Sequence, residues 1–449
     1  MKPVVRRRHL FLAAALVLSL LASMPGASAA PAASRTTADL DLRALRVNEL
    51  GAVPVLMYHA FTTNPTTDLW TRSLDDFRGD LTWLYENNFR IVSLHDLVTN
   101  TIDIPAGKRP VVLTFDDAAA RQFQLVTDRE GNTVPAPDTA VGTLEAFLAT
   151  YPDLGRGGHF AIVGQNCFTF KTDPDRSATW EAECGRKLQW LSEHGYEVGN
   201  HTWSHPNLSQ LDAAGFEAEV GRNAAFIDRL VEGPGNQSGI LTLPFGEPPS
   251  PGSAAEAEMY GGFRWESAPY VPQAIVRVGH GMTPSPASSL FSPLQITRIN
   301  TDPASLATWF DRIEQREVIV YTSDGDPRSV AIPDPVPAAL AAEFDPDVIG
   351  RSGQSVVRFA DDGAYVDPPL SALPVLQPGT VVYTSDKGVR LRLQPSTAAT
   401  VECRLRNRSP LTIVAGPRIV DTHTWWQVET ADDRTGWVVQ DFLAGPPQE

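Results

Sequence analysis

Two adjacent carboxylates at the end of an apolar, β-branched run form the first arrangement that could do chemistry. The run Val111–Phe115 predicts a strand buried on both faces, and Asp116 and Asp117 follow it directly. Two like charges side by side cost free energy unless a cation lies near them. One aspartate could instead cap a helix, but that role leaves the second carboxylate unexplained. In an α/β barrel, the end of this strand lies on the functional face.

Two histidines four residues apart supply a second chemical signal. His201 and His205 follow the predicted strand Tyr196–Asn200, and their spacing brings both imidazoles to one side of a turn. Two imidazoles and one carboxylate give three protein ligands, the number expected of a catalytic zinc-type site with a position open for water. Each histidine alone is better explained as a hydrogen-bonded core residue. The pair, taken together with the adjacent aspartates, favours a metal site.

These residues resemble the motifs of the polysaccharide deacetylase family, also called the NodB-homology domain or carbohydrate esterase family 4. The segment Thr114–Asp117 is similar to the first motif, with Ala118 in place of the usual glycine. The segment His201–Pro206 matches the second motif completely, and Leu243–Gly246 keeps the end of the third. The opening Met57–His59 is also typical. The resemblance implies a distorted (β/α) barrel that removes N- or O-acetyl groups from a polysaccharide.

The resemblance also implies a role for each matching residue. Asp116 is the expected general base, and Asp117, His201 and His205 are the expected metal ligands. Carboxylate and imidazole ligands suit a divalent cation, with Zn²⁺ expected first and Co²⁺, Ni²⁺ or Mn²⁺ as alternatives. A backbone N–H near Phe245 is expected to help hold the oxyanion. The residues expected to contact substrate or oxyanion are Pro244, Phe245 and Gly246.

Two positions depart from the family's pattern. Thr242 stands where an arginine usually orients the base, which leaves the tuning of Asp116 open. The last motif normally ends a strand with a histidine that acts as general acid, whereas Val318–Asp326 contains no histidine. The candidates for a replacement acid are His59, His280 and Asp324. His59 is taken as the catalytic candidate because it ends the first predicted strand, and a core histidine beside the site is the alternative.

Strands and helices alternate through the region that must position these residues. Apolar runs predict strands at Val53–His59, Phe89–Leu94, Val111–Phe115, Phe160–Val163, Tyr196–Asn200, Ile240–Phe245, Ala274–Val278 and Val318–Tyr321. Apolar residues at helical spacing lie between them, with Ser73 and Asp302 as expected N-caps and Gly195 as an expected helix stop. About eight alternations of strand and helix predict an α/β fold of (β/α)-barrel type.

The start of the chain predicts export. Residues 1–30 combine the basic Arg6–Arg8, the apolar Leu10–Leu21 and the small-residue Ala27–Ala30, as a secretory signal peptide does. Both the general and the twin-arginine export routes fit. A retained anchor is the alternative. We interpret residues 31–50 as a leader segment and expect a secreted protein that is extracellular or associated with the cell wall.

Charge limits the classes of partner. Removal of the signal peptide changes the formal net charge from -16 to -20, because it takes away one lysine and three arginines and no acid. Such an acidic chain is a poor candidate for nucleic-acid binding. No later stretch is long and apolar enough to cross a membrane. A neutral or amino-sugar polymer remains compatible with this charge.

Export also permits a disulfide. Cys167 and Cys184 flank a polar segment and are the expected pair, with two free thiols as the alternative. Cys403 would then remain single, and no chemistry is assigned to it.

The C-terminal part predicts a second, smaller domain. We expect the deacetylase-like domain to span 51–335, a Pro-rich linker 336–378 and an all-β barrel 379–445. The last segment resembles the bacterial SH3 domain, and the resemblance implies binding to peptidoglycan or a wall peptide. Core packing and exposed stacking are both compatible with its tryptophans. Its expected strands are Val381–Tyr383, Val389–Arg392, Leu411–Val414, Trp425–Val428 and Gly436–Val439.

The sequence therefore predicts a secreted, metal-dependent polysaccharide deacetylase that acts on an acetylated polysaccharide. The alternative is a non-catalytic carbohydrate- or peptidoglycan-binding protein that keeps a degenerate deacetylase domain. The departures at Thr242 and in Val318–Asp326 favour the alternative, whereas the complete set of base and ligands favours the enzyme.

Overall fold

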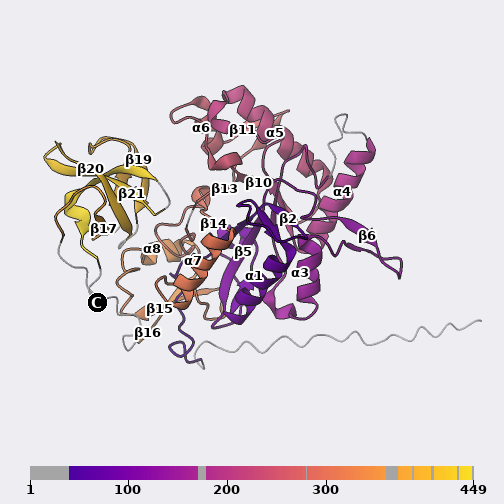
Figure 1. The fold of residues 1–449 in the computed structure, drawn as a ribbon, viewed down its shortest axis with the longest axis horizontal. Coiled ribbons are helices and arrows are strands. Elements are labelled where there is room, and N and C mark those ends of the chain that lie inside the picture. Colours follow the sequence, from indigo (N-terminus) through magenta and orange to yellow (C-terminus); the bar gives the residue numbers. More distant parts are fainter. Residues whose placement is uncertain are drawn as a thin grey trace, which may run out of the picture. The chain divides into compact units, whose positions relative to one another are not determined.

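A parallel β-sheet with helices packed on its outer side dominates the computed structural model (Figure 1). The structure describes residues 40–169, 178–279, 281–360, 373–386, 389–405, 409–431 and 434–446. The predicted signal peptide and His280 lie outside these residues.

Within the described residues the main sheet has eight strands, and every pairing in it is parallel. Their order is β13-β10-β9-β8-β5-β1-β14, with β4 paired to β5. A parallel bridge joins Val276 of the edge strand β13 to Ile296, which lies three residues before the other edge strand, β14. The fold is therefore a distorted (β/α) barrel, as the sequence predicts. The strands are β1 (Val55–Tyr58), β4 (Phe89–Ile91), β5 (Arg109–Phe115), β8 (His159–Ile162), β9 (Glu197–Asn200), β10 (Asn236–Thr242), β13 (Ala274–Val276) and β14 (Ile299–Asn300).

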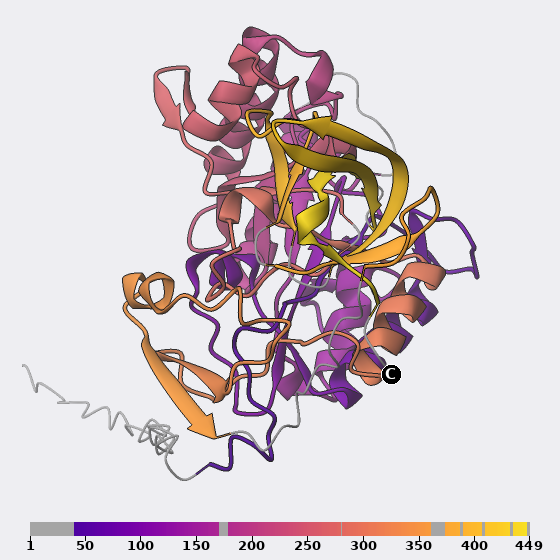
Figure 2. The same cartoon turned by 90° about the vertical axis from the view of Figure 1, so that its left-hand side faces the viewer.

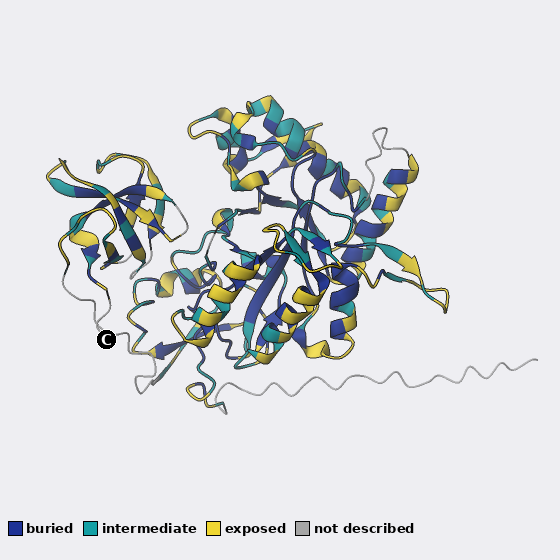
Figure 3. Ribbon diagram, in the orientation of Figure 1, coloured by how far each residue is buried: buried dark blue, intermediate teal, exposed yellow. Residues whose placement is uncertain are grey.

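Helices cover the outer side of this sheet, and Figure 3 shows the strands buried between helices whose outer faces are exposed. Local sequence sets their ends as predicted: Ser73 and Asp302 cap two of them through their side chains, and Gly195, with a φ of 83°, follows a third. The helices are α1 (Leu74–Glu86), α2 (Leu94–Thr99), α3 (Ala140–Leu148), α4 (Ala178–Glu193), α5 (Ala213–Leu230), α6 (Ala254–Gly261) and α7 (Pro303–Glu314).

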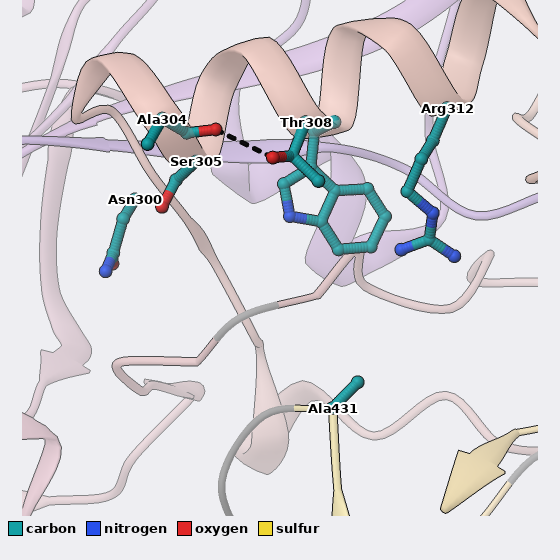
Figure 4. A pocket seen from close by; sticks show the side chains of 7 residues that line it. Asn300, Ala304, Ser305, Thr308, Arg312 and Ala431 are labelled. Atoms are coloured by element: carbon teal, nitrogen blue, oxygen red, sulfur yellow. Dashed lines mark hydrogen bonds between the residues drawn. The ribbon is translucent and has the colours of Figure 1, made fainter. Parts of the chain in front are cut away.

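Helix α7 shows how one such element is built. Asp302 accepts hydrogen bonds from two N–H groups of the first turn, and Leu306 and Ile313 turn toward the core. Figure 4 shows the opposite, polar side of the helix, where the Thr308 hydroxyl donates to the carbonyl oxygen of Ala304 at 2.8 Å.

Strand β5 has two different faces. Leu113 and Phe115 pack into the cluster that the outer helices share, whereas Val112 packs into a separate cluster inside the barrel. Because successive strand side chains point to opposite faces, Thr114 and Asp116 share the inner face with Val112. The strand therefore delivers the first aspartate into the barrel.

The prediction that Val318–Tyr321 forms the last strand of the barrel is wrong. This segment makes one isolated bridge, between Val320 and Ala52. The strand beside β1 is instead β14, which is short and is preceded by an arginine. Sequence patterns favour a continuous apolar run over a two-residue strand that follows a charged residue. The prediction therefore chose Val318–Tyr321 in place of β14.

The chain between the barrel and the C-terminal domain is partly folded. Strands β15 (Ser329–Asp334) and β16 (Ser355–Ala360) pair in parallel, and α8 (Pro346–Arg351) lies between them in sequence. Val330 and Ile349 share a buried cluster with Leu50, so folded structure continues into the segment 336–378 that the sequence predicts as linker. The remaining short ladders are β2 (Ala60–Thr62) with β3 (Thr71–Ser73), β6 (Leu125–Thr127) with β7 (Thr133–Pro135), and β11 (Phe263–Trp265) with β12 (Ala268–Tyr270).

The C-terminal domain is an antiparallel all-β barrel, drawn in gold in Figure 2. Its expected strands are all present, and β19 and β23 were not predicted. Trp426 packs in its core, while Trp425 and Trp437 form a second buried cluster. Core packing therefore accounts for these tryptophans. The strands are β17 (Val381–Thr384), β18 (Val389–Arg392), β19 (Val401–Leu405), β20 (Pro410–Val420), β21 (His423–Thr430), β22 (Thr435–Val439) and β23 (Leu443–Ala444).

In the part of the chain that the structure describes, none of the helices has the length and apolar character needed to cross a bilayer.

Candidate active site

The two adjacent aspartates point in different directions because the chain turns sharply after β5. Asp116 is 1% exposed inside the barrel, and the Asp117 side chain is 35% exposed. Asp117 and Ala118 both have positive φ, at 76° and 51°. The Asn166 amide donates to the Asp117 carbonyl oxygen at 3.1 Å and braces this turn. Glycine is usual at position 118 in the family because it adopts positive φ without steric cost.

Asp116 forms a two-point ion pair with Arg298. Arg298 Nη1 donates to Oδ1 at 2.7 Å and Nη2 donates to Oδ2 at 2.8 Å. Nη1 also donates to the Thr114 hydroxyl at 3.0 Å. Arg298 is fully buried, so this pair stands in a low-dielectric setting where removal of either partner leaves an unpaired charge. The geometry fixes the Asp116 carboxylate plane.

Burial alone would raise the pKa of Asp116. The charge of Arg298, with His201 and His59 as further contributors, outweighs burial and holds the pKa of Asp116 well below its usual range. Asp116 is therefore ionised at neutral pH and able to accept a proton.

Arg298 orients Asp116, the role that the resemblance assigns to an arginine at position 242, where this chain has a threonine. Because position 242 is a threonine, the sequence did not show which residue orients Asp116 and lowers its pKa. The structure supplies an arginine from the segment that leads into β14. Thr242 contributes its carbonyl oxygen instead, which lies 2.8 Å from Nδ1 of His201.

The two histidines lie beside Asp117 in the turn after β9. The Asp117 Oδ1 atom is 3.5 Å from His201 Nε2 and 3.4 Å from His205 Nε2. One ligand atom from each of the three residues lies within 4.8 Å of the other two. His201 is 2% exposed, and His205 is partly exposed. The structure thus brings the three predicted ligands together.

The donor set fits a divalent cation. A carboxylate oxygen and two imidazole nitrogens are the ligands of zinc-type catalytic sites. The contact between His201 Nδ1 and the Thr242 carbonyl oxygen requires a proton on Nδ1, which leaves the Nε2 lone pair directed at Asp117. Burial lowers the pKa of His205 and favours its neutral, ligating form. Burial opposes protonation of His201, but the hydrogen bond to Asp117 raises its pKa overall.

Helix α5 holds the histidine turn. The Glu219 carboxylate accepts hydrogen bonds from the backbone N–H and the hydroxyl of Ser204, both at 2.8 Å. Asn223 Nδ2 donates to Asn200 Oδ1 at 2.9 Å, and the same oxygen accepts from the Thr202 N–H. The positive φ of Thr202 and His205 is therefore supported by side chains of an adjacent rigid element.

His59 lies on the other side of Asp116. Its Nε2 atom is 3.8 Å from Asp116 Oδ2, and the Gln122 amide donates to the carbonyl oxygens of both residues. Burial lowers the pKa of His59, although the charges of Asp116 and Asp117 oppose that effect.

Asp324 is remote from this site. The neighbouring Ser323 exchanges backbone hydrogen bonds with Gly107 and Lys108, at the start of β5, whereas Asp116 follows the end of that strand. Seven strand residues separate the two ends, which corresponds to roughly 23 Å. The structure therefore contradicts Asp324 as a candidate acid, and His280 lies outside the described residues.

The segment Pro244–Gly246 passes beside the histidines. Phe245 has a φ of 58° and is 60% exposed. Its ring centroid is 4.6 Å from that of His205. The expected oxyanion segment thus borders the ligand cluster.

Cys167 and Cys184 form a disulfide with a Cα–Cα distance of 5.7 Å. Cys167 is one residue from Asn166, the residue that braces the Asp117 turn. Cys403, the third cysteine, takes no part in this bridge and is partly buried.

Sequence reasoning missed Arg298, Gln122 and Glu219. Arg298 carried only a weak signal, because it stands between Thr297 and Ile299, just before a strand of two residues. Gln122 and Glu219 carried none, because a polar residue in a loop or on a helix is ordinarily solvated.

Comparison with known protein families identifies two regions. The family model for polysaccharide deacetylase matches residues 159–257, which include both histidines but neither aspartate. The model for the bacterial SH3 domain matches residues 387–444.

Several solved structures are similar to this chain at low identity. A Streptococcus pyogenes deacetylase, solved with acetate, is 16% identical with a TM-score of 0.38, over 57% of this chain and 97% of that one. A Bacillus cereus polysaccharide deacetylase is 15% identical with a TM-score of 0.39, over 58% and 69%. A Bacillus anthracis protein is 15% identical with a TM-score of 0.37, and the match spans 55% of this chain and 64% of that one. The two family models are what identify the domains. The chain therefore contains a polysaccharide deacetylase domain and a bacterial SH3 domain.

Proposed function

We propose that this protein is a secreted, metal-dependent deacetylase that hydrolyses N- or O-acetyl groups of a cell-wall or extracellular polysaccharide. The observation that carries the proposal is the position of Asp117 Oδ1, within 3.5 Å of both Nε2 atoms, beside a second carboxylate that Arg298 holds in place. A structural role for this cluster would not explain why a fixed, ionised carboxylate stands next to three metal-type ligands.

Asp117, His201 and His205 would hold the cation, which we expect to be Zn²⁺. Such an ion supplies a Lewis acid for the acetyl carbonyl and lowers the pKa of a water molecule. Asp116 accepts the proton of the attacking water, because it is ionised and does not ligate in this scheme. Arg298 keeps both Asp116 oxygens oriented, so little reorganisation is needed when the proton arrives.

His59 is the proposed general acid that protonates the leaving group. It lies across Asp116 from the ligands and is partly exposed, so it can reach the substrate. Because the pKa of His59 is lowered, only a small fraction of His59 carries the proton to be donated at neutral pH. An amine leaves poorly without protonation, whereas an alkoxide from an ester depends less on an acid. The Phe245 N–H is the proposed donor to the oxyanion of the tetrahedral intermediate.

The SH3 domain is proposed to bind peptidoglycan or a wall peptide and to keep the enzyme near its substrate. Cosedimentation of the full chain with purified peptidoglycan tests this role, and a chain that stays in the supernatant would contradict it.

The test of the activity is acetate release by the purified, Zn²⁺-loaded protein from peptidoglycan, chitin oligomers, poly-N-acetylglucosamine and acetylated xylan. We expect release from at least one polymer, loss after chelation and recovery after Zn²⁺ is restored. Asp116→Asn should keep the metal and lose at least 10²-fold in rate, the usual scale of a lost general base. Unchanged release in Asp116→Asn or in the metal-free protein would refute the assignment.

The second candidate is a non-catalytic polysaccharide-binding protein, favoured by the absence of a histidine in Val318–Asp326. It predicts binding to one of these polymers without acetate release. The Arg298–Asp116 pair weakens it, because binding alone does not require an oriented base.

A further inference from the structure

Two exposed aromatic rings stand at opposite ends of the row of site residues. Trp70 is 48% exposed, and its ring centroid lies 4.9 Å from that of His59. Phe245 is 60% exposed and contacts His205 in the same edge-on manner. His59, Asp116 and the ligand cluster lie between the two rings, each within 4.0 Å of the next.

Backbone hydrogen bonds and a nearby ion pair hold the segment that carries Trp70. The Trp70 carbonyl oxygen accepts from the Ala60 N–H at 2.9 Å, and its own N–H donates to Asp68 at 2.9 Å. Arg72, two residues further, donates to both oxygens of the buried Asp80. The position of the indole is therefore fixed by the backbone and by an ion pair, although its ring remains open to solvent.

Phe245 is held in a similar way. It adopts positive φ, at 58°, and Gly246 follows with a φ of 71°. A phenylalanine in the left-handed region costs free energy, and an exposed ring gains little from burial in return. Ring exposure at both ends of a catalytic row matches the way proteins bind pyranose rings, which present one apolar face to an aromatic side chain.

The charge beside the two rings limits the kind of polymer. Neither the segment 60–71, which carries Trp70, nor the segment 243–263, which begins beside Phe245, contains a lysine or an arginine. Asp68 and Glu247 are exposed there. A polymer with a carboxylate on every sugar ring would be repelled, whereas one whose sugar rings are neutral or bear amines would not.

We propose that Trp70 and Phe245 are two carbohydrate-binding platforms that hold the sugar units on either side of the acetylated unit, in a chain that is neutral or carries free amines. This inference rests on the proposed deacetylase function and adds to it. The enzyme then acts within a chain, and each platform increases the preference for an oligosaccharide over a monosaccharide.

The test compares the N-acetylglucosamine hexasaccharide with N-acetylglucosamine itself, as the ratio of their kcat/KM values for acetate release. Trp70→Ala and Phe245→Ala should each lower this ratio by roughly tenfold, mainly through KM, because each removes one stacking contact. Trp70→Phe should retain most of the ratio, since it keeps a ring. Tyr260→Ala is the matched control, an exposed aromatic on α6, and should leave the ratio unchanged.

Equal losses on both substrates, or an unchanged ratio, would overturn the inference and leave the deacetylase function standing. No acetate from any substrate with the wild-type protein would instead refute the function and the inference with it. A competition experiment tests the expected charge of the polymer. Glucosamine oligomers should inhibit acetate release from the hexasaccharide, and polygalacturonate should not. Competition by polygalacturonate at equal concentration would contradict that part.

Discussion

Arg298 and Asp116 form the decisive pair at the scale of single residues, although 182 positions separate them. A buried carboxylate without a cation would either take up a proton or destabilise the fold. The pair keeps Asp116 charged and immobile, which is what a general base beside a metal site requires. Asp116 follows β5 and Arg298 precedes β14, and these two strands pair with β1 on either side of it.

Removal of the arginine should change both stability and pH dependence. Arg298→Ala leaves a buried charge unpaired, so we expect a loss of about 3–5 kcal/mol in the free energy of unfolding. Because Arg298 lowers the pKa of Asp116, its loss raises that pKa, and the acidic limb of the kcat/KM profile moves to higher pH. Urea unfolding and a pH–rate profile measure the two effects.

Arg298→Lys is the control for that experiment. It keeps the charge but cannot bond both carboxylate oxygens in one plane, so a smaller shift of the acidic limb is expected. An acidic limb at the same pH in wild type and Arg298→Ala would show that Asp116 is not the titrating base.

At the scale of elements, the histidine turn depends on α5. Glu219 accepts two hydrogen bonds from Ser204, the residue before His205. Residues that orient metal ligands from outside typically contribute 10- to 100-fold to metal affinity. Glu219 is partly exposed, so the lower end of that range applies here.

Glu219→Ala should therefore weaken Zn²⁺ binding by about tenfold, measured by competition with a chelator of known affinity. Glu219→Gln retains one acceptor and should lose less. Glu217→Ala changes a glutamate on the same helix that contacts Glu258 rather than the turn, and should bind Zn²⁺ as the wild type does. An equal loss in Glu217→Ala would mean that the helix, and not this contact, supports the site.

The disulfide braces the other half of the site. It joins residues 17 positions apart, and a loop of this length corresponds to about 3 kcal/mol of unfolding free energy in the chain-entropy model. Replacing Cys167 and Cys184 together by serine should lower stability by that amount in urea unfolding. Cys403→Ser should have no comparable effect, because Cys403 takes no part in this bridge. Equal stability of both variants would contradict a structural role for the bridge.

The sequence predicts the site residues that follow recognisable strands and misses those that do not. Asp116 and Asp117 follow the seven-residue apolar strand β5, and His201 and His205 follow the shorter β9. Parallel strands bring their carboxyl ends to one edge. Arg298 was missed because the strand that follows it is only two residues long and its partner is distant in the sequence. The apolar run Val318–Tyr321 was assigned to the barrel because periodicity does not reveal pairing partners. Local pattern thus predicts strand ends, and tertiary pairing decides which strands meet.

At the scale of the whole molecule, Glu49 fastens the N-terminal segment to the end of the deacetylase region. Its carboxylate accepts hydrogen bonds from the N–H groups of Ala331 and Asp324 and from the Tyr321 hydroxyl. Burial, with the charge of Asp324 as a second cause, raises the pKa of Glu49 to about 8. A carboxyl whose pKa is raised by folding favours the folded state while it is protonated.

Stability should therefore fall as pH rises from about 4.5 to about 8, since the folded chain retains a proton that the unfolded chain releases. Glu49 contributes up to about 1.4 kcal/mol per pH unit to this slope. The measurement is urea unfolding across this range, with chelator present so that metal binding does not contribute. Glu49→Gln should flatten the profile between pH 6 and 8, and an equal slope in both proteins would contradict the raised pKa.

The account as a whole depends on one cation bound jointly by Asp117, His201 and His205. The most direct measurement is an anomalous-difference map at the zinc edge from crystals of the Zn²⁺-loaded protein. We expect one peak about 2.0–2.2 Å from a carboxylate oxygen of Asp117 and from Nε2 of both histidines, with Asp116 outside the ligand shell. A map without a peak among these three residues, or with the zinc bound elsewhere, would contradict the account.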